Sequence, residues 1–240
     1  MTPILAFEAV SFDYPDGTPA LERVTFSVER GEHVALLGPT GSGKSTLLQH
    51  LNGLLMTDRG VVRIDGENVN QNSVRAVRRK VGLVFQDPND QLFLPTLLED
   101  VAFGPLNDGK RPAEAEALAN RTLQELGLDT AGNRAAHHLS GGERRLAALA
   151  TVLVSRPQVL ALDEPTGDLD ARSRMRLVRL LRQRDETLLV ATHDLGAAQA
   201  LCHRGIVLHH GTVVADARLE NILADHDLLE RSGLAAALDD

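Results

Sequence analysis

The chain has 240 residues, of which 43% are hydrophobic, so it is long enough to bury the core of one large domain with up to two lobes. Its formal net charge of −8 argues against duplex DNA as an obligate partner, because phosphate binding normally requires a basic surface. A single cysteine, Cys202, excludes an internal disulfide and favours a reducing compartment. No basic segment precedes an apolar one at the N-terminus, and no run reaches about 18 apolar residues. We therefore expect a soluble, cytoplasmic chain that does not itself cross a membrane.

The first elements of the chain predict two kinds of sheet. Val24, Phe26 and Val28 alternate with polar residues, which is typical of an antiparallel sheet with one face in water. Four later runs are continuously apolar and end in polar residues, namely 33–38, 80–86, 159–164 and 187–194. Such runs indicate strands buried on both faces of a parallel sheet, with the chemistry at their carboxyl ends.

Helical patterns fill the middle of the chain. They cover 97–103, 112–126 and the stretch from Ser140 onward, with no strong strand between Asp87 and Pro157. After Asp170 we expect an arginine-rich helix, a strand, a helix, a hairpin that turns at Gly211 and a helical tail. The pattern predicts a single domain over 1–240. An α/β nucleotide-binding lobe would comprise 1–86 and 158–240, and a helical lobe 87–157.

Residues 38–46, GPTGSGKST, match the phosphate-loop pattern G-x-x-x-x-G-K-[ST]. They lie between a predicted buried strand and an amphipathic helix, the context that this motif requires. Glycines permit a nest of backbone N–H groups around phosphate oxygens, the lysine reaches the terminal phosphates, and the serine after it offers its hydroxyl to Mg²⁺. The predicted nucleotide-binding residues of this loop are Gly38, Pro39, Thr40, Gly41, Ser42, Gly43, Lys44, Ser45 and Thr46.

Polar side chains at the ends of three other apolar runs extend this site. Asp163 would hold Mg²⁺, usually through water, and Glu164 would polarise the attacking water. The end of a third strand would deliver His193 beside Glu164 and the γ-phosphate, where it could orient water and sense phosphate loss. Gln86 closes its apolar run in the same way. Taken singly, a surface acidic pair and a structural or capping histidine are the alternatives.

The stretch HHLSGGERRLAALA, residues 137–150, predicts a second helix start with unusual glycines. Ser140 and Glu143 form a capping box, and apolar residues follow at helical spacing, so the arginines at 144–145 are expected in water. Gly141 and Gly142 occupy the first turn, where each is less favourable than alanine by up to about 1 kcal/mol. Because they leave N–H groups uncovered at the positive helix end, they suit a bound anion. The sequence thus predicts a second anion site.

Taken in this order, these elements resemble the ATP-binding cassette (ABC) family of ATPases over essentially the whole chain. The resemblance implies an α/β fold with a P-loop (RecA-like) core and a mainly parallel sheet, an N-terminal antiparallel β subdomain and an inserted α-helical subdomain. It makes residues 139–143 the family's signature, Gln86 its Q-loop residue and His193 its switch histidine. Tyr14 stands where the family stacks an aromatic ring on adenine, although edge-strand packing is the alternative.

On this resemblance, residues 167–170 correspond to the family's D-loop, but they depart from its frequent Ser-Ala-Leu-Asp form. Asp170 still matches the last residue of that form, whereas the role of Asp168 is left open.

The resemblance also implies how the two anion sites combine. In this family two cassettes face head to tail, and ATP on the phosphate loop of one is covered by the signature helix of the other. The implied catalytic residues are Glu164, His193, Lys44 and Gln86, and the implied Mg²⁺ ligands are Ser45, Gln86 and Asp163. The implied nucleotide contacts beyond the phosphate loop are Tyr14, Ser140, Gly141, Gly142 and Asp170.

Residues 84–107 look most like the energy-coupling-factor ATPases, and among these like the cobalt/nickel branch. Leu92, Phe93, Leu94 and Pro95 follow the Q-loop, where the family docks a coupling helix of a membrane partner; burial in the helical lobe is the alternative. The implied function is the ATP-hydrolysing subunit of a membrane importer, a homodimer or a pair with a paralogous ATPase, at the cytoplasmic face of the cell membrane. The alternatives are an exporter or lipoprotein-release ATPase, and a soluble ABC ATPase acting on DNA or ribosomes.

Two further groups of residues suggest other functions. Cys202, His203, His209 and His210 could suggest a metal site, but adjacent residues in a strand point to opposite faces, so we expect none. Six arginines lie between Arg172 and Arg184 on a predicted helix. We interpret them as a solvated or partner-facing surface and expect no nucleic acid.

Overall fold

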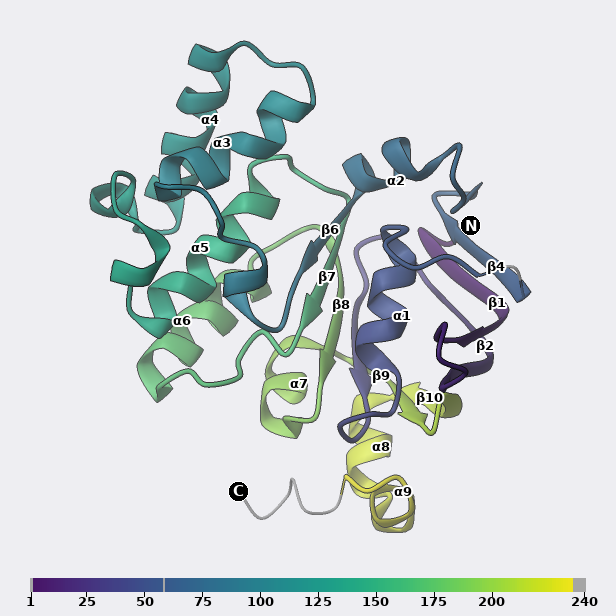
Figure 1. Cartoon of the computed structure of the whole chain (residues 1–240). Coiled ribbons are helices and arrows are strands. Elements are labelled where there is room, and N and C mark those ends of the chain that lie inside the picture. Colours follow the sequence, from purple (N-terminus) through teal and green to yellow (C-terminus); the bar gives the residue numbers. More distant parts are fainter. Residues whose placement is uncertain (1, 58, 235–240) are drawn as a thin grey trace. The chain divides into compact units, whose positions relative to one another are not determined.

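The computed structural model of the chain describes residues 2–57 and 59–234, which form two compact units. The first unit contains the described residues up to Leu83, the segment Gln158–Glu164 and the residues from Leu181 onward. The second unit contains Val84–Pro157 and Pro165–Leu180. The fold is the predicted α/β type, with an antiparallel sheet, a mainly parallel sheet and a helical insertion (Figure 1).

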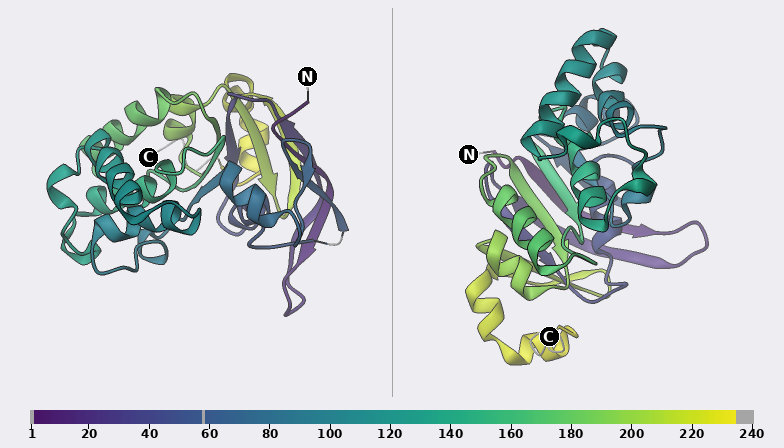
Figure 2. Two further views of the ribbon diagram at one scale, coloured as in Figure 1. Left: turned by 90° about the horizontal axis from the view of Figure 1, so that it is seen from above. Right: turned by 90° about the vertical axis from the view of Figure 1, so that its left-hand side faces the viewer.

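The antiparallel sheet of the first unit has the order β2-β1-β4-β5. In β2, Val24, Phe26 and Val28 are buried while Thr25 is exposed, so the predicted alternation is confirmed. Both views in Figure 2 show β1 and β2 (purple) as a long hairpin. The strands are β1 (Leu5–Asp13), β2 (Pro19–Val28), β4 (Arg59–Ile64) and β5 (Glu67–Asn68).

The second sheet has the order β10-β9-β3-β8-β7-β6 and carries the four predicted apolar runs. Strand β8 pairs in parallel with both β3 and β7, so the carboxyl ends of these three strands meet at one edge. The hairpin of β9 and β10 turns at His210 and Gly211, as predicted. The strands are β3 (His33–Leu37), β6 (Val81–Val84), β7 (Val159–Asp163), β8 (Thr187–Thr192), β9 (Arg204–His209) and β10 (Thr212–Arg218).

Helices cover this sheet and complete the first unit. Helix α1 packs on β7 and β8, and α7 packs on β3 and β8. Every residue of β7 and β8 is buried, which explains why both strands read as continuous apolar runs. The helices are α1 (Lys44–Leu51), α2 (Val74–Lys80), α7 (Leu195–Leu201), α8 (Leu219–Ala224) and α9 (His226–Arg231).

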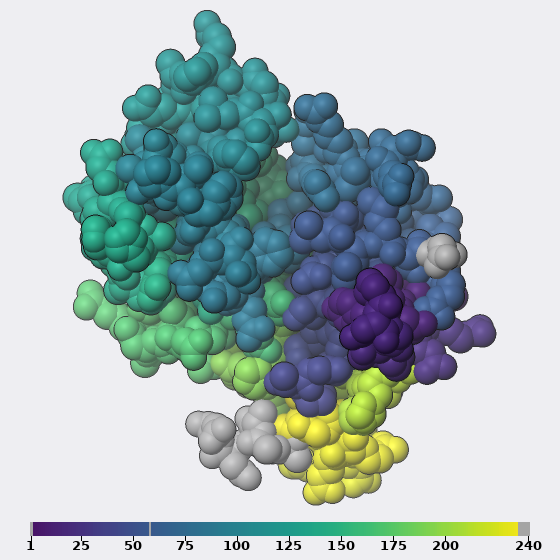
Figure 3. Space-filling model, viewed as in Figure 1, coloured from purple at the N-terminus to yellow at the C-terminus, as the bar shows by residue number. Residues whose placement is uncertain are grey.

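The second unit is helical, as predicted, and α3 packs on both α4 and α5. In Figure 3 the atoms of α3 and α4 (teal) form an outer surface of this unit. Its elements are the 3-10 turns η1 (Pro88–Asp90), η2 (Asp129–Ala131) and η3 (Ala136–His138), and the helices α3 (Leu97–Asn107), α4 (Pro112–Glu125) and α5 (Gly141–Leu153), with α6 (Ala171–Arg182) for most of its length.

Two boundaries differ from the prediction. Residues 84–86 and 165–180 were expected in the α/β lobe, but they belong to the helical unit. The reason is a set of hydrogen bonds from arginines to carbonyls within that unit: Arg176 donates to Leu126, and Arg145 donates to Gly167. Across the described part of the chain, each helix is too short or too polar to span a lipid bilayer.

Candidate active site

The phosphate loop connects β3 to α1, which is the strand, loop and helix order that its motif predicts. A Cβ atom added at Gly38 would lie 2.2 Å from the carbonyl oxygen of Leu208. Gly43 has a φ of +104°, and a Cβ there would lie 2.6 Å from the carbonyl oxygen of Ala20. Both positions therefore require glycine because the chain's own backbone packs against them.

Lys44 begins α1 and is only 7% exposed. Its Nζ donates to the carbonyl oxygens of Gly38, at 2.6 Å, and Pro39, at 3.1 Å. Burial lowers the pKa of the Lys44 ammonium, while the carboxylates of Glu164 and Asp163 oppose that shift. A buried ammonium therefore lies on the loop where the motif expects it to reach phosphate.

Ser42 offers a second polar group in the same loop. Its Oγ is buried and has no hydrogen-bond partner among the described residues. A buried hydroxyl that lacks a partner is costly, so it points to a ligand or water that the loop accepts. Together with the glycine backbone and Lys44, it fits a bound phosphate chain.

Glu164 follows β7, and it is held by hydrogen bonds to β8 and to His193, the residue after β8. Its Oε2 accepts a hydrogen bond from Oγ1 of Thr192 at 2.8 Å, and its Oε1 accepts one from the backbone N–H of His193 at 3.1 Å. Its own N–H donates to the carbonyl of Ala191 at 2.8 Å. The φ of Glu164 is +42°, a conformation that costs about 1–3 kcal/mol for a non-glycine residue. The carboxylate is thus fixed in one orientation.

His193 lies against this carboxylate, as was predicted for a histidine at the end of another strand. Its Nδ1 is 2.8 Å from Oε1 of Glu164, which in turn lies 4.0 Å from Nζ of Lys44. The His193 side chain is 60% exposed, whereas that of Glu164 is 9% exposed. The site therefore presents a buried carboxylate behind an accessible imidazole. Asp163, which ends β7 and precedes Glu164 in the sequence, is also buried.

Tyr14 lies just after β1 and is half-buried. Its hydroxyl is 2.8 Å from Oγ1 of Thr46, and its ring packs edge-on against Phe12 with centroids 5.3 Å apart. The hydroxyl thus ties the ring to the first turn of α1. This contact was not predicted from the sequence, because the two residues are distant along the chain.

The signature segment begins α5 in the second unit. Its capping box is confirmed: the N–H of Ser140 donates to Glu143 Oε2 at 2.8 Å, and the N–H of Glu143 donates to Ser140 Oγ at 3.3 Å. The hydrogen bond from the Ser140 N–H, together with the Ser140 side chain, lowers the pKa of the Glu143 carboxyl. A Cβ added at Gly141 would meet no atom within 4 Å, whereas one at Gly142 would lie 2.5 Å from Oγ of Ser173. Packing within the chain therefore explains one of the two glycines and leaves the other unexplained.

The prediction that both arginines after the signature lie in water is wrong for Arg145, which is only 5% exposed. Its Nη1 donates to the carbonyl of Gln86 at 2.5 Å and to that of Phe85 at 3.4 Å. Its Nη2 donates to the carbonyl of Gly167 at 3.2 Å. A charged group is buried here because three backbone carbonyls receive its N–H groups. Helical periodicity alone gives no sign of those acceptors.

Gln86 and the D-loop line one cavity of about 350 Å³ in the second unit, together with Gly141 and Arg144. Asp168 in this cavity has a φ of +57°. Asp170 is exposed, and its Oδ1 accepts a hydrogen bond from the N–H of Ser173 at 2.8 Å, which lowers the pKa of this carboxyl. The structure therefore gives Asp170 a capping contact at the start of α6.

Phe93 lies in the loop that follows Gln86, and its side chain is 63% exposed. It packs edge-on against Phe103 of α3, with ring centroids 5.4 Å apart, and Phe103 itself is 42% exposed. Leu92, by contrast, is buried, so this part of the predicted docking segment serves the helical core. Asp100 accepts the N–H groups of Phe93 and Leu94 and thereby fixes the loop, and burial raises the pKa of its carboxyl.

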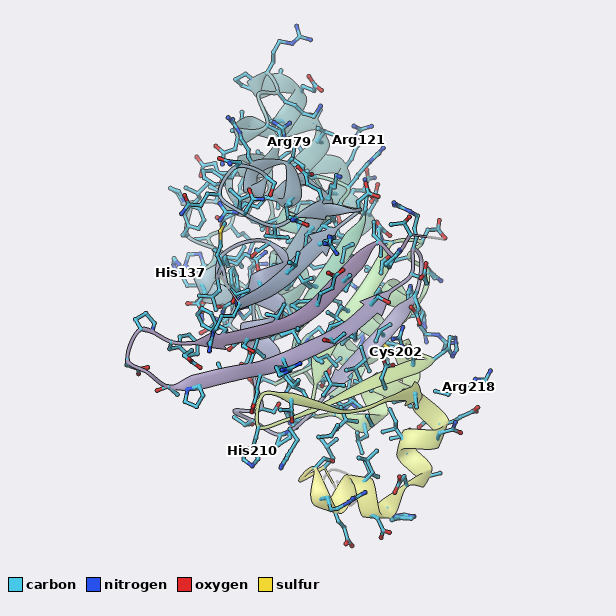
Figure 4. All side chains as sticks on the ribbon, turned by 90° about the vertical axis from the view of Figure 1, so that its right-hand side faces the viewer. Arg79, Arg121, His137, Cys202, His210 and Arg218 are labelled. Carbon is cyan, nitrogen blue, oxygen red and sulfur yellow. The ribbon has the colours of Figure 1, made fainter. Side chains whose placement is uncertain are left out.

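The cysteine and histidine residues near β9 do not lie as predicted. His209 ends the strand and His210 is in the turn, with a φ of +47°, so the two rings lie 4.1 Å apart instead of on opposite faces. Figure 4 labels Cys202 and His210, which flank opposite ends of β9. Burial raises the pKa of Cys202 to about 12. Within the described residues, no three His, Cys, Asp or Glu side chains form a group suited to a metal ion.

Comparisons with known proteins identify the family and the fold of the chain. The family model for ABC transporters matches residues 21–167. The energy-coupling factor transporter ATP-binding protein EcfA of Methanothermobacter thermautotrophicus is 43% identical over 94% of this chain and 74% of its own length. The structure of CbiO1 from Clostridium perfringens, described as part of the ABC transporter complex CbiONQ, has a TM-score of 0.83 at 32% identity and covers 98% of this chain and 96% of CbiO1.

A dimeric structure of the ATP-binding cassette MJ0796, in a post-hydrolysis state with ADP and Pi, has a TM-score of 0.81 at 31% identity. It covers 90% of this chain and 98% of that protein. The family model covers more than half of the chain. The fold and the phosphate loop are consistent with that family. The chain belongs to the ABC transporter family, as an ATP-binding and ATP-hydrolysing subunit of a transporter.

Proposed function

We propose that the chain is the ATPase of an energy-coupling-factor importer for cobalt or nickel ions and works as a head-to-tail dimer with two shared ATP sites. The observation that carries the catalytic part is the Glu164 carboxylate, fixed by Thr192 and His193 and 4.0 Å from the Lys44 ammonium. The importer class is supported by the similarity to EcfA and CbiO1.

In this proposal Glu164 polarises the water that attacks the γ-phosphate, and His193 orients Glu164 and that water. Lys44 stabilises the negative charge that develops on the terminal phosphate oxygens. Gln86 takes the role that the family gives it, at the metal and the attacking water. The catalysis is positioning and charge stabilisation, since phosphoryl transfer to water needs no covalent intermediate.

The donor set of the first unit fits MgATP. Residues 38–46 would hold the phosphates, and Tyr14 would stack on the adenine. Ser45 and Asp163 supply the oxygen ligands that Mg²⁺ prefers, a hydroxyl at the start of α1 and a buried carboxylate at the end of β7. A Mg²⁺ ion held by Ser45 and Asp163 would supply positive charge that neutralises the phosphates.

The dimer part of the proposal rests on the signature helix. Ser140 and Gly141 are exposed and lie at the positive end of α5, and Gly141 has open space around it. These groups suit the triphosphate of a second copy or of a paralogous ATPase, and Gly142, the next residue, and Asp170, elsewhere in the same unit, would add to the contact. The related cassette MJ0796 has a dimeric structure with ADP and Pi, which supports a dimer for this chain.

Phe93 and Phe103, with Leu106 of α3 at 42% exposed, offer apolar surface for a membrane subunit. A coupling helix docked there would place the chain on the cytoplasmic face of the cell membrane. An exporter or a lipoprotein-release system would use a similar docking site, and a soluble ABC ATPase that acts on DNA or ribosomes would not need one.

Metal uptake in cells tests the proposal. The chain would be expressed with its membrane partners, and uptake of radioactive cobalt and nickel would be compared with that in cells carrying Glu164→Gln. Uptake of either ion that depends on Glu164 is the expected result. Uptake of a different solute would overturn the metal assignment, and ATPase activity stimulated by DNA with no membrane partner would favour the soluble alternative.

A pair of surface variants tests the docking site. Phe93→Asp should abolish uptake and release the chain from membranes, while ATP hydrolysis by the isolated chain stays within about twofold. Leu54→Asp is the matched control, because Leu54 is 48% exposed but belongs to the first unit. Equal loss of uptake in both variants would contradict a docking role for Phe93.

A further inference from the structure

Arg145 is a permanently charged side chain buried in a helix whose neighbouring positions are apolar. It is 5% exposed, like Leu146, and Ala147 and Ala148 after it are fully buried. Burial of a guanidinium is costly unless its N–H groups find acceptors. If this position served packing alone, an apolar side chain would be sufficient. The hydrogen bonds made by the guanidinium therefore need an explanation.

Its acceptors lie on two segments that are far apart in the sequence. Nη1 donates to the carbonyls of Gln86 and Phe85, at 2.5 and 3.4 Å, and Nη2 donates to the carbonyl of Gly167, at 3.2 Å. The planar guanidinium carries its donors in a rigid fork, so one side chain holds both segments in a fixed geometry.

All three segments joined in this way border the same cavity of the second unit. Gln86, Gly141 and Gly167 line it together with Arg145 itself. A second contact also joins the signature helix to the residues after the D-loop, because Gly142 lies so close to Ser173 that a Cβ would come within 2.5 Å of its Oγ. The helix start, the Q-loop and the D-loop therefore meet in one packed region.

We propose that Arg145 is a positioning residue that holds the Q-loop backbone at Gln86 and the D-loop backbone at Gly167 to the signature helix. The three segments then move as one body when ATP is bound or hydrolysed. Arg145 donates to the backbone carbonyls of Phe85, Gln86 and Gly167, and it acts on the reaction through Gln86 and the D-loop. The inference rests on the roles proposed above for Gln86 and the signature helix.

The test compares three variants of the full chain. Arg145→Met keeps a long side chain but removes every donor, and Arg145→Lys keeps the charge but not the fork that joins two segments. Arg121→Met is the matched control, since Arg121 is an exposed arginine on α4 of the same unit (Figure 4).

Kinetics and hydrogen exchange are then measured together. We expect Arg145→Met to lower kcat by about 10- to 100-fold, because small misplacements of a catalytic group are costly. Arg145→Lys should lie between it and the wild type, and nucleotide affinity should change by less than about twofold, as should every property of Arg121→Met. Amide exchange should accelerate in residues 84–87 and 166–169 but not across the rest of the unit.

Several outcomes would overturn the proposal. They are a wild-type kcat in Arg145→Met, unchanged exchange in both segments, and exchange that accelerates uniformly because the unit as a whole has lost stability. If Arg145→Met fails to fold, Arg145→Lys gives the same two readouts. Gln86→Ala distinguishes the role proposed for Gln86 from the role proposed for Arg145. A wild-type kcat in Gln86→Ala contradicts the role of Gln86, whereas the hydrogen-exchange rates of Arg145→Met test the role of Arg145 alone.

Discussion

The two glycine-rich loops of this chain differ in what requires their glycines. In the phosphate loop of the first unit, Gly38 and Gly43 have backbone carbonyls of the same chain within 2.6 Å of an added Cβ. At the signature of the second unit, Gly141 has open space around it. The fold of the first loop therefore requires glycine at positions 38 and 43, whereas Gly41 has open space around it. In the second loop Gly142 packs against Ser173, and only Gly141 is left uncovered, which is what a ligand carried by another chain would need.

The strongest test of the first loop's chemistry is Glu164→Gln. This variant keeps the size of the side chain but removes the charge that polarises water, so kcat should fall by about 10²- to 10⁴-fold while ATP stays bound. Size-exclusion chromatography with ATP should show an accumulated dimer. Glu116→Gln on the exposed side of α4 is the control for the same chemical change. ATP turnover at the wild-type rate by Glu164→Gln would remove the general-base role.

Gly141→Asp tests the second loop in the same assay. A carboxylate there would repel the triphosphate of the other chain, and we expect hydrolysis to fall by about 100-fold or more. The fold should survive, because an acidic residue in the first turn stabilises a helix by about 0.3–1 kcal/mol. Nucleotide affinity of the monomer, measured by fluorescence titration, should be nearly unchanged.

The comparison between the loops is sharpened by Gly43→Ala. Its φ of +104° and the nearby Ala20 carbonyl should make this change lower the stability of the monomer and its nucleotide affinity together. If Gly141→Asp caused the same combined loss, the two loops would serve one site within a single chain, and the shared-site proposal would fail.

Tyr14 should have a smaller effect, on affinity alone. Stacking of a base on an aromatic ring is worth about 1–3 kcal/mol, so Tyr14→Ala should weaken ATP binding roughly tenfold. Tyr14→Phe keeps the ring but loses the contact with Thr46, and its affinity should stay within a few-fold of the wild type. If both variants bound ATP as the wild type does, the ring would only pack on the edge strand.

The smallest effect that we expect is a loss of stability at acidic pH, which originates from a buried histidine in the first unit. His50 of α1 is 1% exposed, and burial lowers the pKa of its imidazole, although the bond from Nδ1 to the Thr46 carbonyl opposes that shift. Below a pH of about 6.5 the unfolded chain therefore takes up a proton that the folded chain resists, so this contribution to stability is lost as the pH falls.

Thermal unfolding between pH 7.5 and pH 5.5 measures this loss. His50→Gln should lose less stability on acidification than the wild type does, by no more than a few degrees in Tm. His137→Asn in the second unit, an exposed histidine labelled in Figure 4, should follow the wild type. Identical pH profiles for the wild type and His50→Gln would assign the acid sensitivity to other groups.

The sequence by itself determined the elements whose signal is local or periodic. The motif at 38–46 with its flanking strand and helix, the capping box of Ser140 and Glu143, and the placement of His193 beside Glu164 were all predictable. The last of these followed because parallel strands that are apolar throughout share one sheet, and their carboxyl ends meet at one edge. The roles given to these residues remain proposals.

Only the tertiary structure decided which contacts cross between distant segments. The burial of Arg145 depends on carbonyls 59 residues before it and 22 residues after it, and the ring of Tyr14 is held by a residue 32 positions away. Helical periodicity assigns a residue to a face but does not say what covers that face. For the same reason, the sequence placed residues 165–180 in the wrong lobe, because their arginine and carbonyl partners become neighbours only once the chain has folded.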